Sequence, residues 1–175
     1  AIKKGSKIIV TENKTKKKID GVIYIRTKNI RKLIAEIAFK IHKFIPKNLI
    51  AVTGTNGKSS IANFYYQILR LNKKKVASIG TLGVKSDKIN HRLPNTTVDP
   101  LYLGQILKKL KDSEIDNVIM EASSHGLKQH RLDGLQFSTG IFTNLSQDHI
   151  DYHKNFRNYF KACLLYTSPS PRDNR

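Results

Sequence analysis

The chain has 175 residues, a hydrophobic content of 39% and a formal net charge of +19 at pH 7. This length suffices for one hydrophobic core, or for one core and part of a neighbour. A membrane-spanning protein is excluded, because no stretch approaches the roughly 18 uninterrupted apolar residues of a span, and no signal-peptide pattern opens the sequence. The only cysteine, Cys163, excludes an internal disulfide and suits a reducing cytoplasm, where we expect the protein to be.

The positive charge raises the question of nucleic-acid binding. Much of it lies in short lysine runs at 16–18, 73–75 and 108–109, in expected turns or on polar helix faces. No aromatic residues are interleaved with these runs to form a platform for stacked bases. We interpret the lysines as a solvated surface that would also attract a polyanionic nucleotide, and expect no specific nucleic-acid partner. A basic nucleic-acid-binding NTPase is the alternative from another class.

The first 46 residues are typical of the end of a small α/β unit. Short apolar runs at 7–10 and 21–26, separated by a polar stretch, predict two strands. Apolar residues at the i, i+3, i+4, i+7 spacing then predict an amphipathic helix over 30–41. Asn29 is its expected N-cap, and Pro46 prevents its continuation.

From residue 47 to 162 we expect one domain in which strands alternate with helices. Apolar runs at 49–52, 76–79, 117–120 and 139–143 predict strands, and helical spacing at 61–69 and 103–110 predicts helices between them. This alternation predicts an α/β fold with a mostly parallel sheet and helices on both faces. Ligands of such sheets bind beyond the carboxyl ends of the strands.

A glycine-rich loop joins the predicted strand at 49–52 to the helix at 61–69. Glycines let a loop turn its N–H groups toward a phosphate, and the following helix adds its own unpaired N–H groups. Two residues separate Gly54 from Gly57, whereas the general pattern has four, so a plain turn is the alternative. We expect nucleotide contacts from Gly54, Thr55, Asn56, Gly57, Lys58, Ser59 and Ser60. Lys58 would reach the β- and γ-phosphates, and the Ser59 hydroxyl would bind Mg²⁺.

Residues 53–59, Thr-Gly-Thr-Asn-Gly-Lys-Ser, resemble the shortened phosphate loop of the Mur ligases and of folylpolyglutamate synthetases. The segments 120–131 and 142–153, with 95–97, resemble the Mur ligases that add the third residue to UDP-N-acetylmuramoyl-L-alanyl-D-glutamate. The likeness covers most of residues 1–162. It implies a monomeric, ATP- and Mg²⁺-dependent ligase of peptidoglycan synthesis that joins this dipeptide substrate to diaminopimelate or lysine through an acyl phosphate. A folylpolyglutamate synthetase-like ligase is the alternative within the same fold.

The resemblance also implies catalytic roles for Lys58, Glu121 and His149. Glu121 ends a predicted strand and would bind Mg²⁺ with Ser59, although a capping or ion-pairing carboxylate is the plainer interpretation. His149 matches the family histidine near a second metal. Without the family, His149 and His153 at i, i+4 could be a helical zinc pair. Asn144, at the end of the 139–143 strand, could position phosphate or backbone in the same cleft.

Six polar residues match the family's contacts to the nucleotide-sugar peptide: Asn95, Thr96, Thr97, Ser123, Gln129 and Arg131. Arginine suits the D-glutamyl carboxylate because its guanidinium offers planar bidentate donors. The three residues at 95–97 follow Pro94, so turn and cap roles are the alternative for them. His125 and His130 receive no role.

Two departures from the family pattern concern the ends of the similarity. The family has three domains, and we interpret 1–46 as the end of the first and 47–162 as a truncated second, so we expect no ligation by this chain alone. The family places a carbamylated lysine at the position of Cys163, and a thiol cannot form that carbamate. The stretch 167–172 has two prolines and no apolar period. We therefore expect 163–175 to be a disordered tail of foreign or frame-shifted sequence.

Overall fold

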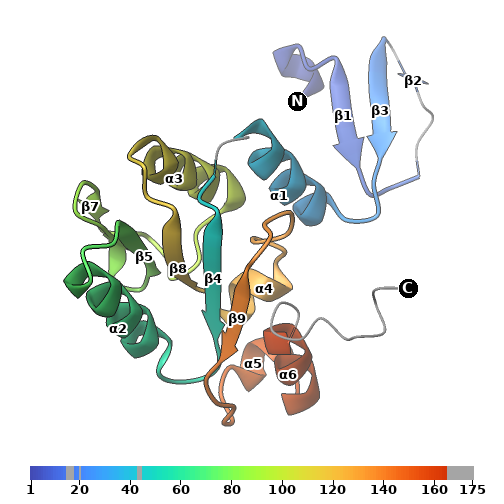
Figure 1. The fold of residues 1–175 in the computed structure, drawn as a ribbon. Coiled ribbons are helices and arrows are strands. Elements are labelled where there is room, and N and C mark those ends of the chain that lie inside the picture. Colours follow the sequence, from blue (N-terminus) through green and yellow to red (C-terminus); the bar gives the residue numbers. More distant parts are fainter. Residues whose placement is uncertain (15–17, 20, 43–44, 165–175) are drawn as a thin grey trace, which may run out of the picture.

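A computed structural model describes residues 1–14, 18–19, 21–42 and 45–164. Its centre is a six-stranded sheet in the order β7-β6-β5-β8-β4-β9 (Figure 1). The neighbours β5–β8, β8–β4 and β4–β9 are parallel, whereas β6 and β7 form an antiparallel edge. The strands are β4 Asn48–Thr53, β5 Val76–Gly80, β6 Gly83–Lys85, β7 Asn90–His91, β8 Asn117–Glu121 and β9 Thr139–Phe142. The predicted α/β class with a mostly parallel sheet is confirmed.

Helices cover both faces of this sheet because its central strands are apolar on both sides. On one face Leu49, Ala51, Val118 and Met120 pack with the helices α1 and α3 in the larger core cluster. On the other face Val52 and Ile119 pack against Ala62 of α2. The helices are α1 Ile30–Ile41, α2 Lys58–Leu71 and α3 Pro100–Asp112. Alternate residues of one strand therefore face different helices, as expected of a buried parallel sheet.

The N-terminal residues form a second, three-stranded sheet in the order β1-β3-β2, and Figure 1 shows α1 between it and the large sheet. It contains β1 Ile8–Thr11, β2 Lys18–Ile19 and β3 Val22–Arg26, after a short 3₁₀ helix at Ile2–Lys4. The predicted N-cap of α1 is confirmed, because the Asn29 Oδ1 accepts a hydrogen bond from the Lys32 backbone N–H at 3.0 Å.

Three helices follow the strands of the large sheet and lie near its carboxyl edge: α4 Ser124–Lys128, α5 Ile150–His153 and α6 Phe156–Leu164. These three helices were not among the elements predicted from the sequence. Helix α6 continues through Cys163 to Leu164, two residues past the expected domain end, because Tyr159, Ala162 and Cys163 are buried along one face of this helix. Residues 165–175, which hold most of the expected tail, lie outside the described residues.

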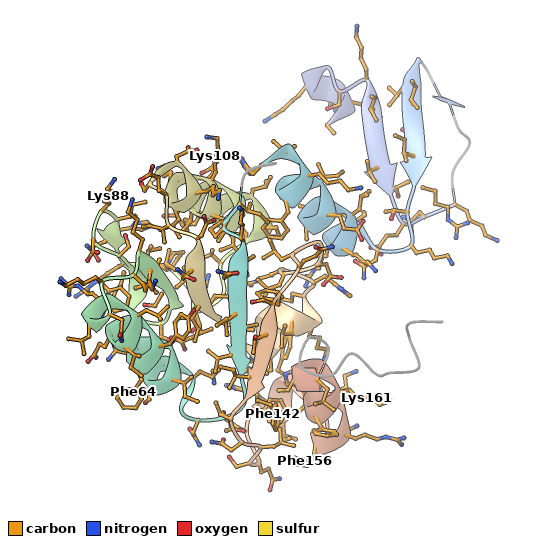
Figure 2. All side chains as sticks on the ribbon, in the orientation of Figure 1. Phe64, Lys88, Lys108, Phe142, Phe156 and Lys161 are labelled. Atoms are coloured by element: carbon orange, nitrogen blue, oxygen red, sulfur yellow. The ribbon has the colours of Figure 1, made fainter. Side chains whose placement is uncertain are left out.

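Most of the lysines whose side chains the structure describes are exposed. Figure 2 shows Lys88, Lys108 and Lys161 pointing outward from the body of the protein. Several lysines are paired with acids; Lys108 lies 2.5 Å from Asp112, for example. In the part of the chain that the structure describes, no helix is long and apolar enough to cross a membrane.

Candidate functional site

The loop between β4 and α2 lies at the carboxyl edge of the sheet, and its glycines are required for different reasons. Gly54 has φ +128°, and a Cβ there would lie 2.1 Å from the Thr143 Oγ1 and 2.8 Å from the Asn144 carbonyl oxygen. Gly57 caps α2 with φ +84° and faces open space. Gly54 therefore lets the loop approach residues 143–144 closely, whereas Gly57 permits the turn into the helix.

Asn144 holds this loop from the neighbouring strand. Its Oδ1 accepts from the Asn56 N–H at 3.0 Å, and its Nδ2 donates to the Asn56 carbonyl at 3.1 Å. Its own carbonyl accepts from the Thr55 N–H at 3.0 Å. The structure therefore places Asn144 against the backbone of the loop and not among the residues that line the cavity described below.

Lys58 folds over the loop that precedes it. Its Nζ donates to the carbonyl oxygens of Gly54 at 2.7 Å and Thr55 at 2.8 Å. An ammonium group carries three N–H donors, so one remains for another acceptor. The charge of Lys58 is thereby held against the loop, at the lining of the cavity described below.

The side chains of Glu121 and Ser59 form a hydrogen bond beside the same loop. The Ser59 Oγ donates to the Glu121 Oε2 at 2.8 Å, and Thr81 donates its N–H to Oε1 at 2.9 Å and its hydroxyl to Oε2 at 3.1 Å. Glu121 is only 3% exposed. A Cβ on Gly80 would lie 2.2 Å from the Glu121 Oε1, so the absence of a side chain at this position makes room for the carboxylate.

These groups line a cavity of about 300 Å³. Of the predicted residues, it brings together those of the loop with Thr96, Glu121, Ser123 and His149. Two further residues line the cavity that were not predicted from the sequence, Thr81 and Ser124. Thr81 directly follows β5, so the rule that ligands bind beyond the carboxyl ends of strands could have found it. The full lining is Gly54, Thr55, Asn56, Gly57, Lys58, Ser59, Ser60, Thr81, Thr96, Glu121, Ser123, Ser124 and His149.

Thr97 is buried beneath the cavity and connects its walls. Its hydroxyl donates to the Glu121 carbonyl at 2.9 Å and accepts from the Ser123 N–H at 2.9 Å. The Ser123 Oγ also caps α4 by accepting from the Gly126 N–H at 3.2 Å. Asn95 is exposed and does not line the cavity. Of the predicted 95–97 trio, only Thr96 therefore faces the cavity directly.

Gln129 and Arg131 lie in a second, smaller pocket of about 200 Å³, which Arg31, Ile34 and Pro100 also line. The Gln129 Oε1 accepts from the Arg131 Nε at 3.1 Å and from its Nη2 at 2.7 Å. The Arg131 Nη1 donates to the Thr97 carbonyl. Through Thr97 the two pockets share one hydrogen-bonded wall.

A cluster of histidine and tyrosine rings lies beside the cavity. His125 stacks on Tyr152 with ring centroids 4.0 Å apart, and the His149 ring lies 4.8 Å from His125. The His153 Nε2 lies 3.0 Å from the Ser124 Oγ, and burial, with a smaller contribution from the Lys128 charge, lowers the pKa of His153 to about 4. Within the described residues no three His, Cys, Asp or Glu side chains gather to hold a metal, so the zinc alternative finds no support.

The residues of the cavity fit one Mg²⁺ ion but not the second metal that the resemblance implied. The Ser59 hydroxyl and the Glu121 carboxylate supply the oxygen ligands that Mg²⁺ prefers. Cys163, at the position of the family lysine, is fully buried, and burial raises the pKa of its thiol. A protonated thiol is a poor ligand for a hard cation. Cys163 therefore does not replace the lysine that the resemblance implied for a second metal.

The sequence matches a known protein family. The sequence family described as the Mur ligase middle domain matches residues 52–174. The chain belongs to the Mur ligase family. The match includes the residues after Cys163 that the sequence analysis had set apart.

The chain is also similar to individual Mur ligases. The chain is 42% identical over 168 residues to the UDP-N-acetylmuramoyl-L-alanyl-D-glutamate–2,6-diaminopimelate ligase of Rickettsia montanensis, a match that covers 94% of this chain and 35% of that protein. A solved structure of a ligase with the same name superposes with a TM-score of 0.71 at 29% identity, over 87% of this chain and 31% of that one. The MurF ligase of Thermotoga maritima in complex with ADP, at 16% identity and a TM-score of 0.54, shares the fold. The chain spans about a third of the length of these Mur ligases.

Proposed function

We propose that this chain is the nucleotide-binding part of an ATP-dependent ligase of peptidoglycan synthesis. The substrate is UDP-N-acetylmuramoyl-L-alanyl-D-glutamate, and the added amino acid is diaminopimelate, the one in the names of the relatives above. The single observation that carries this proposal is the shared cavity. It joins the phosphate loop and the Ser59–Glu121 pair to Thr96 and Ser123, two of the expected substrate contacts.

The geometry supports phosphoryl transfer to a carboxylate. The loop N–H groups and the remaining N–H donor of Lys58 would hold the phosphates of ATP, and Ser59 and Glu121 would hold Mg²⁺. When bound, Mg²⁺ would offset the negative charge of the β- and γ-phosphates. Thr96 and Ser123 would place the substrate carboxylate against the γ-phosphate, whose oxygens Lys58 stabilises during transfer.

The reaction then proceeds in two steps. The γ-carboxylate of D-glutamate attacks the γ-phosphorus of ATP, and the bond from this phosphorus to the β,γ-bridging oxygen breaks. ADP departs, and the substrate becomes an acyl phosphate. The amine of the amino acid next attacks the acyl carbon and displaces inorganic phosphate, with loss of a proton from nitrogen. Most of the catalysis in the first step lies in positioning and in charge stabilisation, which the loop and Lys58 are built to supply.

Isothermal titration calorimetry of the purified chain tests the choice of substrate. We expect saturable binding of UDP-N-acetylmuramoyl-L-alanyl-D-glutamate, and no saturable binding of dihydropteroate or of a short DNA duplex at 150 mM salt. Dihydropteroate stands for the folate-type ligases, and the duplex for a nucleic-acid-dependent NTPase. Binding of either control ligand without binding of the muramoyl dipeptide would refute the proposal.

A further inference from the structure

The smaller pocket, which Gln129 and Arg131 line, also contains Arg31, a basic residue that was not among the predicted site residues. Arg31 comes from the first turn of α1, whereas Gln129 and Arg131 follow α4, so the three side chains meet only in the folded chain. Ile34 and Pro100 complete the lining. Among the described residues, therefore, no carboxylate lines this pocket, and two guanidinium groups do. Such a pocket favours an anion.

Hydrogen bonds to Gln129 and Thr97 fix the Arg131 guanidinium but leave some of its N–H donors unused. A guanidinium has five N–H donors, one on Nε and two on each terminal nitrogen. Three of them are used, on the Gln129 Oε1 from Nε and Nη2 and on the Thr97 carbonyl from Nη1. One donor therefore remains on each terminal nitrogen, and a carboxylate or phosphate can accept such donors. Gln129 is itself fixed, since its Nε2 donates to the Tyr152 hydroxyl at 3.0 Å.

Arg31 complements this held arginine. Its side chain is exposed and makes no hydrogen bond or ion pair with any residue that the structure describes. Its neighbour on the helix, Lys32, by contrast lies 4.0 Å from Glu36. Arg31 therefore brings a guanidinium without an ion-pair partner among the described residues to a pocket that Arg131 also lines.

We infer that Arg31 is a substrate-binding residue that, with Arg131, holds an anionic group of the UDP-muramoyl dipeptide. This inference rests on the proposed function. The shared hydrogen-bonded wall through Thr97 and Ser123 places the pocket next to the phosphate cavity, so one extended substrate can occupy both. The anion is either the α-carboxylate of the D-glutamyl residue or the diphosphate of the nucleotide, because both accept paired N–H donors.

Calorimetry of the full chain with matched variants tests this inference. We expect Arg31→Ala to weaken binding of the UDP-muramoyl dipeptide about tenfold and to leave ADP binding unchanged. Arg31→Lys should lose less, because it keeps the charge without the planar donor pair. The control Lys40→Ala removes an equal charge from the exposed end of the same helix and should change neither affinity. Unchanged ADP affinity and circular dichroism show that the variants fold.

An analogue with an α-carboxamide in place of the α-carboxylate identifies the anion. If the penalty of Arg31→Ala disappears with this analogue, Arg31 holds the carboxylate; if the penalty persists, Arg31 holds the diphosphate. Dipeptide binding by Arg31→Ala within twofold of the unaltered chain would overturn the inference and leave the proposed function standing. An unaltered chain that binds ADP but no dipeptide would overturn both.

Discussion

Glu121 illustrates how one residue depends on several others in this site. Its buried carboxylate accepts hydrogen bonds from Ser59 and twice from Thr81, and it fits only because residue 80 is glycine. A buried carboxylate is expensive unless it is hydrogen-bonded or binds a cation. The hydrogen bonds hold the carboxylate in place, and its negative charge beside the phosphate loop favours a bound cation. The role of Glu121 as a Mg²⁺ ligand remains a proposal.

Replacement of Glu121 by glutamine tests that role. The amide has the same shape but no charge, so we expect Glu121→Gln to lose most of the increase in ATP affinity that Mg²⁺ gives, about tenfold or more, while the affinity measured in EDTA changes little. Titrations of ATP with and without Mg²⁺ measure this difference. Glu114→Gln, on an exposed carboxylate that pairs with Lys75, is the control. An unchanged Mg²⁺ effect in Glu121→Gln would show that the ion binds elsewhere.

His153 predicts a pH dependence of stability. Its pKa is lowered from 6.5 to about 4, chiefly by burial and then by the charges of Lys128, His125 and His149, against an opposing contribution from Asp151. Below pH 6.5 the unfolded chain binds a proton at this site that the folded chain does not bind until about pH 4. The stabilisation is therefore complete above pH 6.5 and is lost as the pH falls toward 4, at about 1.4 kcal/mol per pKa unit.

Urea unfolding at pH 7, 5.5 and 4.5 measures this effect. The free energy of unfolding of the unaltered chain should fall over this range by about 2 kcal/mol more than that of His153→Gln, whose amide can still bond to Ser124 without titrating. Parallel pH dependence in both proteins would show that His153 does not titrate as its burial implies.

At the scale of elements, the approach of β9 to the phosphate loop makes a glycine necessary. We expect Gly54→Ala to destabilise the chain by about 2–4 kcal/mol, because a Cβ there meets Thr143 and the backbone of Asn144 at an already positive φ. Gly57 also has a positive φ, +84°, but open space around it, so about 1 kcal/mol is expected for Gly57→Ala. Thermal unfolding compares the two variants. Equal losses would mean that the contact with Thr143 relaxes freely.

The long elements could be predicted from sequence, and the short ones could not. Strands such as β4 and β8 are uninterrupted apolar runs, and α1 and α3 repeat apolar residues at helical spacing, so their local patterns agree with the fold. Strands β6 and β7 have three and two residues and exist through antiparallel pairing with β5, which no local pattern encodes. Helix α6 did carry a signal, since Phe156, Tyr159, Phe160 and Cys163 have helical spacing.

The same distinction applies to the site. The loop residues are adjacent in sequence, so their phosphate-binding chemistry could be predicted together. Thr81 bonds to Glu121 across 40 positions, and Arg31 joins Arg131 across 100, so only the folded chain brings these pairs together. The placement of Asn144 against the loop backbone likewise depends on β9 lying beside β4.

At the scale of the whole molecule, the positive charge is distributed and partly paired. Lys108 lies 2.5 Å from Asp112, and Arg70 lies 3.1 Å from Asp87. Such exposed pairs contribute little to stability and leave a diffuse positive field. That field would draw polyanionic nucleotide substrates toward the chain, and it does not require a nucleic-acid partner.

The central claim is that one edge of this sheet holds ATP and the muramoyl dipeptide side by side. Calorimetric titration of a non-hydrolysable ATP analogue with Mg²⁺, in the absence and the presence of saturating UDP-N-acetylmuramoyl-L-alanyl-D-glutamate, tests it most directly. We expect the analogue to bind in both cases, with an affinity that the dipeptide leaves unchanged or increases. Mutual exclusion of the two ligands, or no binding of the nucleotide, would contradict it.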